Sequence, residues 1–410
     1  MLDKSTGRVV VTGMGVVSSI GVEVAEFLDG LRSGRSSVRH ISAFDTSGFD
    51  HAMGCEVVGF SPEDWIRTPP ESLGRAGQFS AAAARMAVGH AALDTAELRE
   101  RSCLVAVGTT DGEARDLDGL VETELAHGPG ALDPAVAARV TADRLSAAVV
   151  HELGLDRVEA VTLPTACAAG NYAVGYGFDA IRAGDVDMAL CGGADALCRK
   201  TFTGFYRIGT IAPERCQPFD KNRSGILTGE GAGVLVLESL ESALARGARI
   251  HAEVLGFGLN CDADHPVAPN GDSVAHCMRL ALDNADVKPE DVDFISAHGT
   301  GTRANDVTEA TAIRRVFGSG TAPPTISVKS MLGHSMGAAS ALASIGCVLA
   351  ITEGFIPPTV NHVETDPECG LDCVPNHAVE ARPRVVQNNG LAFGGNNAVL
   401  IYGRYDQELA

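Results

Sequence analysis

Short apolar runs recur along the chain, and each is closed by a glycine or a small polar residue. In eight of them the apolar positions are continuous rather than alternating with polar ones, which is typical of strands buried on both faces of a sheet. The predicted strands span 8–13, 103–108, 158–163, 186–192, 233–238, 292–296, 325–328 and 398–402.

Between several of these runs lie alanine-rich stretches in which apolar positions recur with helical spacing. The predicted helices span 79–93, 172–182, 274–286, 306–317 and 339–353. Alternation of strands and helices predicts an α/β fold in which helices cover a largely parallel sheet.

Two corners between a strand and a helix repeat the same layout. Strand 158–163 leads into Cys167 and then Gly170, and strand 325–328 leads into His334 and then Gly337. In both cases the glycine follows three residues later and lets the next helix approach the sheet closely. The repeat predicts two duplicated α/β halves, 1–250 and 251–410, which bring Cys167 and His334 together at a pseudo-twofold axis.

Composition and charge narrow the class of protein. The chain has 410 residues, 45% of them apolar, and 52 acidic residues against 32 basic ones give a net charge of −20. Such a charge repels phosphate backbones and anionic membranes, so we expect no nucleic-acid or membrane partner. The most apolar stretch, 338–351, is shorter than the ~20 residues that span a bilayer, and residues 1–17 show no export signal. We therefore expect a cytoplasmic protein.

The eleven cysteines form no C-x-x-C pair. Cys369 and Cys373 have no second pair with which to complete a zinc site, so we expect no metal. Free thiols are typical of a reducing compartment, where most cysteines behave as small apolar core residues. We expect this of ten of the eleven, and Cys167 is the exception.

Cys167 stands at a tight corner before a helix. The free amides and the positive dipole end of that helix can lower the pKa of a thiol and can hold an oxyanion. The arrangement therefore suits a thiolate nucleophile that forms a thioester. Taken alone, an inert cysteine packed in a turn is the commoner interpretation of such a residue.

Three further segments carry residues capable of chemistry. His298 ends an apolar strand and is followed by glycines and threonines that could bind an extended ligand. Lys329 precedes His334, and if buried it would need a carboxylate such as Asp306 or Glu309. A bulky aromatic, Phe393, lies among glycines in 391–397 and either swings as a gate or belongs to a simple hairpin turn.

Seven motifs follow one another along the chain. Together with segments 9–15 and 393–397 they cover the chain almost from one end to the other. They are Thr165-Ala166-Cys167, Gly192-Gly193-Ala194-Asp195, Pro218-Phe219-Asp220, Gly229-Glu230-Gly231-Ala232-Gly233, His298-Gly299-Thr300-Gly301-Thr302, Lys329-Ser330-Met331-Leu332-Gly333-His334 and Pro357-Pro358-Thr359. In these motifs the chain resembles the beta-ketoacyl-ACP synthases of type II and the ketosynthases of polyketide pathways. The resemblance implies the thiolase fold, with duplicated α/β halves in five layers, αβαβα.

The resemblance also implies a two-stage condensation. Cys167 would accept an acyl chain from the phosphopantetheine arm of a carrier protein, and the enolate of a malonyl-type extender would then attack that thioester. His298 and His334 would stabilise the enolate, and the amides of Cys167 and Phe393 would hold the tetrahedral oxyanion. No cofactor beyond the carrier's arm is implied.

The remaining site residues have supporting roles in this resemblance. Thr300 and Thr302 would bind the pantetheine amides, and Gly394 would contribute to substrate binding. Lys329 would order the histidine pair through a carboxylate, Glu309 in first place and Asp306 in second. Phe393 would act as the gating aromatic.

The chain departs from the family pattern at Ala343, where many synthases carry glutamate, at Leu391-Ala392 before Phe393, and at Asn396. These departures keep a second function open, in which the same Cys-His-His set closes a bound acyl chain by intramolecular aldol or lactone-forming chemistry. A third function, a non-catalytic subunit like a chain-length factor, conflicts with the presence of Cys167.

The expected partners follow from the same resemblance. An acyl carrier protein or carrier domain is acidic, so the chain needs a local basic patch, for which Arg199, Lys200 and Arg207 are candidates. The family forms dimers through the sheet near the nucleophile corner. We therefore expect a homodimer, or a heterodimer with a ketosynthase-like subunit.

Overall fold

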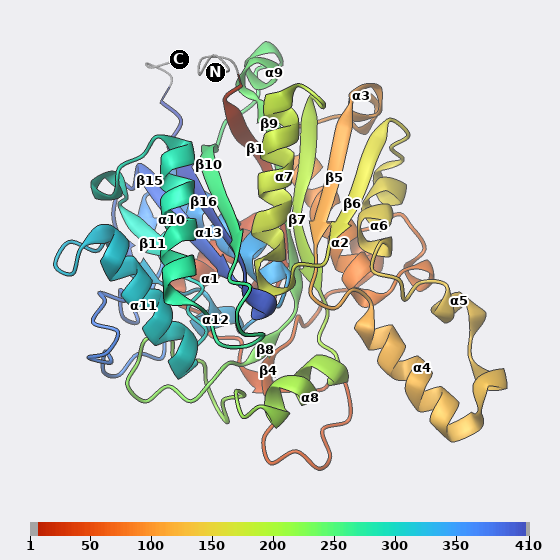
Figure 1. The fold of residues 1–410 in the computed structure, drawn as a ribbon. Helices are drawn as coiled ribbons and strands as arrows, with labels where there is room; N and C mark the ends of the chain where they lie inside the picture. Colours follow the sequence, from red (N-terminus) through yellow and green to blue (C-terminus); the bar gives the residue numbers. More distant parts are fainter. Residues whose placement is uncertain (1–6, 407–410) are drawn as a thin grey trace.

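The computed structural model describes residues 7–406, in which one large sheet has helices on both sides (Figure 1), beside a two-stranded and a three-stranded sheet. The expectation about an export signal in 1–17 falls partly on residues 1–6, outside the described residues. From Gly7 to Asp406, no helix has both the length and the apolar character needed to cross a bilayer.

The ten main strands divide into two sets of five that are arranged alike about the centre of the sheet. From edge to centre, the first set is β6 (Val158–Leu163), β5 (Cys103–Gly108), β7 (Met188–Asp195), β9 (Gly231–Ser239) and β1 (Val9–Ser18). From centre to edge, the second set is β10 (Ala252–Cys261), β16 (Asn396–Gly403), β15 (Val385–Leu391), β11 (Phe294–Ser296) and β12 (Thr325–Ile326).

The direction of the strands repeats in both halves and corrects one prediction. The three outer strands of each half are parallel, whereas the next strand inwards and the innermost strand pair antiparallel with their neighbours. β1 and β10 pair antiparallel where the halves meet. The sheet is therefore mixed, and the prediction of a largely parallel sheet was wrong, because buried antiparallel strands are as continuously apolar as parallel ones.

Six helices complete the layers. Helices α7 (Ala169–Ala183) and α13 (Ala338–Glu353) pack against each other between the two halves. The outer face of the first half is covered by α2 (Arg75–His90) and α6 (Arg144–Leu153), and that of the second half by α10 (Gly271–Ala285) and α11 (Arg303–Phe317). This is the five-layer arrangement of the thiolase fold. Residues 338–351 of α13 are buried all round, which explains why this segment is the most apolar of the chain.

Shorter elements lie at the ends of these layers. The helices are α1 (Val24–Ser33), α3 (Thr95–Glu100), α4 (Ala114–His127), α5 (Pro134–Ala137), α8 (Arg199–Arg207), α9 (Leu240–Ala245) and α12 (Lys329–Leu332). The strands are β2 (Gly21–Val22), β3 (Arg39–His40), β4 (Met53–Cys55), β8 (Thr228–Gly229), β13 (Phe355–Ile356) and β14 (Val379–Glu380). Short 3₁₀ turns are η1 (Pro62–Asp64), η2 (Pro70–Ser72), η3 (Pro129–Ala131), η4 (Ala166–Ala168), η5 (Pro289–Asp291) and η6 (Phe393–Gly395).

All eight predicted strands and all five predicted helices coincide with observed elements; among the ten main strands β10 and β15 were missed, and among the six main helices α6. The interior of β15 is polar, with Gln387, Asn388 and Asn389 all buried. The Asn388 amide donates to Asn171 of α7 and to Ser344 of α13, at 3.0 and 2.8 Å. The Asn388 nitrogen thus finds acceptors on helices of both halves, so the strand needs no apolar pattern to be buried.

β6 differs from its prediction in another way. It was expected to be buried on both faces, yet it forms the edge of the sheet, and Glu159 and Ala160 are exposed. An edge strand that carries apolar residues is a template for pairing with another chain. The division into 1–250 and 251–410 stays a prediction.

Candidate active site

Cys167 and His334 occupy equivalent corners of the two halves. Cys167 lies in η4 between β6 and α7, and His334 lies between β12 and α13. The preceding residue is left-handed in both cases, with φ of 52° at Ala166 and 67° at Gly333. A non-glycine residue in this region costs about 1–3 kcal/mol, so the Cys167 corner is held in place by its surroundings.

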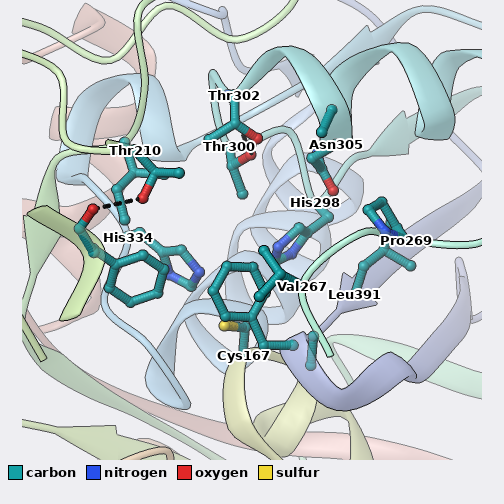
Figure 2. A pocket seen from close by; sticks show the side chains of 15 residues that line it. Cys167, Thr210, Val267, Pro269, His298, Thr300, Thr302, Asn305, His334 and Leu391 are labelled. Atoms are coloured by element: carbon teal, nitrogen blue, oxygen red, sulfur yellow. Dashed lines mark hydrogen bonds between the residues drawn. The ribbon is translucent and has the colours of Figure 1, made fainter. Parts of the chain in front are cut away.

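Cys167 lies at one end of a cavity of about 90 Å³ (Figure 2). Figure 2 shows its sulfur between the His298 and His334 rings, with Thr300 and Thr302 farther along the cavity. The lining residues are Cys167, Phe205, Thr210, Ile226, Val267, Pro269, His298, Thr300, Thr302, Ala304, Asn305, His334, Leu391, Ala392 and Phe393.

The two histidine rings lie edge to face, with centroids 5.5 Å apart and planes at 82°. The Met336 amide donates to Nδ1 of His334 at 3.2 Å. An imidazole nitrogen that accepts a hydrogen bond carries no proton, so the proton of neutral His334 resides on Nε2. His334 therefore offers an N–H donor without having to become charged.

Burial keeps both imidazoles neutral. It lowers the pKa of His298 and of His334 well below the usual value of 6.5, and the nearby Lys329 ammonium lowers both further. A second positive charge beside Lys329 in a dry site is unfavourable. At neutral pH the pair can therefore donate hydrogen bonds without releasing a proton to the substrate.

The His298 peptide is fixed by two buried charged side chains. Glu309 accepts from the amides of His298 and Gly299, both at 2.8 Å, and Lys329 donates to the carbonyl oxygen of His298 at 2.6 Å. Asn389 donates to Glu309 from the neighbouring strand at 3.0 Å. Lys329 and Glu309 thus position His298 from behind and do not line the cavity.

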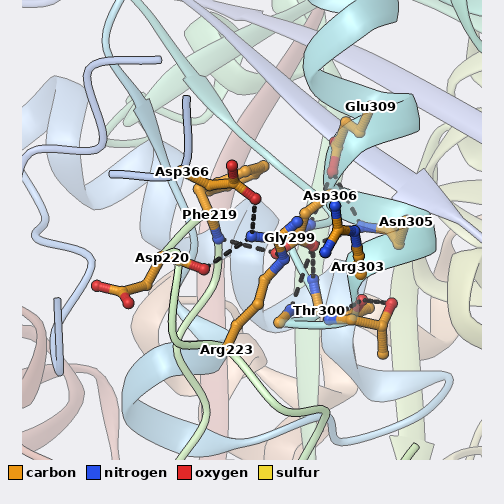
Figure 3. Close-up of polar contacts among 12 residues, drawn as sticks. Phe219, Asp220, Arg223, Gly299, Thr300, Arg303, Asn305, Asp306, Glu309 and Asp366 are labelled. Atoms are coloured by element: carbon orange, nitrogen blue, oxygen red, sulfur yellow. Dashed lines mark hydrogen bonds and ion pairs between the residues drawn. The ribbon is translucent and has the colours of Figure 1, made fainter. Parts of the chain in front are cut away.

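Asp306 holds the rest of the loop that carries His298 (Figure 3). Its carboxylate accepts from the amides of Thr300, Gly301 and Phe219 at 3.1, 3.2 and 2.8 Å, and Arg223 Nε lies 3.4 Å away. Burial raises the pKa of Asp306 to about 6 despite these donors. The Thr300 and Thr302 hydroxyls lie 2.9 Å apart, both within the lining of the cavity.

Cys167 is not the activated thiolate that its place before a helix suggests. Burial raises the pKa of its thiol to about 12, while Lys329 and the Phe393 amide oppose this rise. The prediction of a lowered pKa was therefore wrong for this site, because the loss of water outweighs the favourable charges. The Phe393 amide faces the sulfur, as an oxyanion donor requires.

Phe393 lies in η6, in the hairpin between β15 and β16, and is 37% exposed. Its ring centroid is 5.3 Å from that of Phe205 in α8, and Phe205 lies 6.5 Å from His334. Gly394 follows with φ of 82°, and its amide donates to Pro266 rather than lining the cavity.

The structure brings six of the nine predicted site residues together around the cavity and places Lys329 and Glu309 directly behind it. Phe205 and Asn305 were missed, and nothing in their local sequence distinguishes them, since each is brought to the cavity by the packing of its helix. Of the ten cysteines expected in the core, nine are buried and Cys261 is exposed.

Two family models match most of the chain. Residues 6–243 match the N-terminal domain of beta-ketoacyl synthases, and residues 251–363 match the C-terminal domain. The chain therefore belongs to the beta-ketoacyl synthase family. It is a ketosynthase of the kind that includes the 3-oxoacyl-ACP synthases 2 and the type II polyketide ketosynthases, acyltransferases that form carbon–carbon bonds.

Individual relatives agree with this assignment. Nodulation protein E of Rhizobium meliloti (strain 1021) is 38% identical over 96% of this chain and 98% of its own length. The 3-oxoacyl-[acyl-carrier-protein] synthase 2 of Synechocystis sp. (strain ATCC 27184 / PCC 6803 / Kazusa) is 35% identical over 97% and 98%.

Solved structures are similar over the same extent. A chain of the ishigamide ketosynthase/chain length factor is 62% identical with a TM-score of 0.96, covering 98% of this chain and 100% of that one. A chain of AntDE:AntF, a type II PKS acyl-carrier protein in complex with its ketosynthase, is 30% identical with a TM-score of 0.90, over 98% and 100%.

Proposed function

We propose that this ketosynthase extends acyl chains by decarboxylative condensation, with Cys167 as nucleophile and His298 and His334 as donors to the enolate. The observation that carries the proposal is the convergence of these three side chains on one cavity. A non-catalytic subunit has no use for a cysteine at the Cys167 corner facing two neutral imidazoles.

In the first stage, the Cys167 sulfur attacks the thioester carbonyl of an acyl-carrier protein. The carbonyl oxygen becomes an oxyanion, which the amides of Cys167 and Phe393 stabilise. Collapse breaks the bond to the carrier's sulfur, and the proton that leaves Cys167 ends on the released phosphopantetheine thiol. No external base is consumed, so a thiol with a raised pKa can still complete the exchange.

In the second stage, a malonyl-type carrier thioester loses carbon dioxide, and the electron pair of the broken bond forms an enolate. Nε2–H of His334 and the His298 imidazole donate to the enolate oxygen. The enolate carbon attacks the carbonyl carbon of the Cys167 thioester, the bond from that carbon to the Cys167 sulfur breaks, and the departing thiolate takes up one proton from the solvent. The products are a beta-ketoacyl carrier thioester, carbon dioxide and the free thiol.

The carrier would dock at the mouth of the cavity, near the end of α8. Of the predicted basic patch, Arg199 lies over the Phe49 ring at 5.2 Å and Lys200 is paired with Asp111 at 2.5 Å. Arg207, beside the exposed Ile208, has no ion-pair partner within residues 7–406. Arg207 is therefore the cation available to an acidic carrier.

Two variants separate the stages. Cys167→Ala should abolish acylation by an acyl-carrier protein, as followed by intact-protein mass spectrometry. His334→Ala should leave acylation within a few fold of wild type but slow carbon dioxide release from a malonyl carrier by about 10²–10³-fold, the usual loss for one oxyanion donor. His276→Ala, an exposed histidine of α10, is the matched control.

The products decide between extension and cyclisation. The acylated enzyme is incubated with and without malonyl-carrier protein, and the products are weighed. Growth that requires the extender supports condensation, whereas a cyclic, isomeric or dehydrated product formed without it identifies a cyclase. Loss of acylation in His334→Ala with carbon dioxide release from the malonyl carrier intact would contradict the assigned roles.

A further inference from the structure

We propose that Asp195 is a positioning residue that sets the His334 imidazole relative to the Cys167 thiol, acting through Gly337. The inference rests on the proposed condensation, in which His334 stabilises the enolate. Asp195 is the last residue of β7, is fully buried and does not line the cavity.

Asp195 binds groups from both halves of the molecule. Its Oδ1 accepts from the Thr109 hydroxyl at 2.6 Å and the Asp111 amide at 3.0 Å, and its Oδ2 accepts from the Thr110 amide at 2.8 Å. Oδ2 also accepts from the Gly337 amide at 2.6 Å, across to the second half. One carboxylate thereby ties the loop after β5 to the start of α13.

Gly337 connects the two catalytic corners. Its carbonyl oxygen accepts from the amide of Gly170, three residues after Cys167, at 3.2 Å. The Gly337 amide, which Asp195 binds, belongs to the peptide group between Met336 and Gly337. The amide of the preceding residue, Met336, donates to Nδ1 of His334. Asp195 therefore orients the turn that decides which nitrogen of His334 carries the proton.

The surrounding backbone leaves little freedom for this turn. A Cβ atom on Gly337 would lie 2.5 Å from the Cα of Thr109, and one on Gly193 would lie 2.4 Å from the Gly337 carbonyl oxygen. Real side chains never approach so closely. The glycines permit the close approach, and the Asp195 hydrogen bonds select the orientation of the peptide within it.

Only a carboxylate satisfies all four donors. Asparagine has one acceptor oxygen, and its NH₂ group would face amide N–H groups that can only donate. Asp195→Asn would therefore leave at least one buried donor unpaired and would weaken the charge-assisted hydrogen bonds that hold the Gly337 peptide. The variant keeps the size of the side chain, so the packing around β7 is retained.

The test compares the two chemical stages in Asp195→Asn. We expect decarboxylation of a malonyl carrier to fall at least tenfold in kcat with little change in KM. Labelling of Cys167 by iodoacetamide should stay the same or become faster, because the Asp195 charge opposes the thiolate. By ¹⁵N NMR of histidine, the His334 ring should change from the Nε2–H tautomer to a mixture.

Two further variants complete the test. Thr109→Val removes one of the four bonds and should give a smaller loss of kcat in the same direction, even if Asp195→Asn does not fold. Glu152→Gln is the matched control, because Glu152 is also buried and accepts backbone amides, of Arg67 and Thr68, but lies in α6 away from the cavity.

The outcomes separate this inference from the proposed function. If wild type releases no carbon dioxide from a malonyl carrier, the proposed function fails, and the tautomer measurement still tests the role of Asp195. If wild type is active and both Asp195→Asn and Thr109→Val keep its kcat and tautomer, the inference is overturned. Equal losses of labelling and decarboxylation would show general damage to the site and would overturn it too.

Discussion

At the scale of single residues, the site combines a protonated thiol with two neutral imidazoles. Burial raises the pKa of Cys167 to about 12 and lowers those of His298 and His334 below 6.5, so all three groups are uncharged at neutral pH. The buried charges of Lys329 and Glu309 are bound to the backbone at His298. An uncharged site suits a reaction in which negative charge appears only as bonds break.

The raised pKa of Cys167 predicts its reactivity with pH. Between pH 6.5 and 9 the pH of the solution is far below the pKa of the Cys167 thiol. The fraction of thiolate therefore grows tenfold for each pH unit and does not level off in this range. Labelling by iodoacetamide should rise with the same slope, as measured by mass spectrometry of the peptide containing Cys167. A Cys261→Ser background removes the exposed thiol as a competitor.

A rate that levels off below pH 9 would show that the thiolate is already formed in the resting enzyme. In that case the Lys329 charge and the hydrogen bond from the Phe393 amide would outweigh the loss of water at the Cys167 thiol.

At the scale of elements, the site depends on how closely α7 and α13 approach each other. Gly170 makes this possible, since a Cβ atom there would lie 2.6 Å from the Ala341 nitrogen and 2.8 Å from the Ala341 Cβ. The two helices begin at the Cys167 and His334 corners. Their separation therefore sets the distance between the Cys167 thiol and the His334 imidazole.

Gly170→Ala should force α7 and α13 apart. We expect a loss of about 1–3 kcal/mol in the free energy of unfolding, the usual cost of overpacking, together with a fall in condensation. Gly89→Ala is the matched control near the end of α2, where nothing lies within 4 Å of a new Cβ, and it should be neutral or stabilising. The measurement is denaturant unfolding; equal stabilities of the two variants would contradict the role of Gly170.

At the scale of the whole molecule, two neighbouring features of the first half have the character of an interface with another subunit. β6 is an edge strand of the large sheet, and α4 projects from the body of the molecule (Figure 1). Leu117, Val121 and Leu125 follow one face of α4 at spacings of four and are 45%, 47% and 84% exposed. Such a stripe indicates a surface that another subunit covers.

We therefore expect Val121→Glu with Leu125→Glu to weaken subunit association, because two carboxylates would be buried in an apolar interface. Light scattering should show that wild type, either as a homodimer or as a heterodimer with a chain-length-factor-like subunit, has twice the mass of the double variant. Glu124→Gln on the same helix is the control. A double variant that keeps the mass of wild type would exclude this face of α4 from the interface.

The sequence alone predicted the class of fold, eight of the ten main strands, five of the six main helices and six of the residues that line the cavity. A tight corner such as 165–170 needs backbone conformations that only certain residues adopt. The residues of such a corner therefore form a short motif that can be recognised in the sequence. The equivalence of the Cys167 and His334 corners was also visible, since a duplicated fold repeats its local constraints.

Properties that depend on neighbours distant in the chain could be known only from the folded arrangement. The pKa of Cys167 follows from burial by several elements, the polar strand β15 is stable because α7 and α13 supply partners for its amides, and Asp195 meets Gly337 across the two halves. The direction of the strands and the edge position of β6 also depend on residues that are distant in the chain. Hydrogen bonding and desolvation act through space, so no local pattern records them.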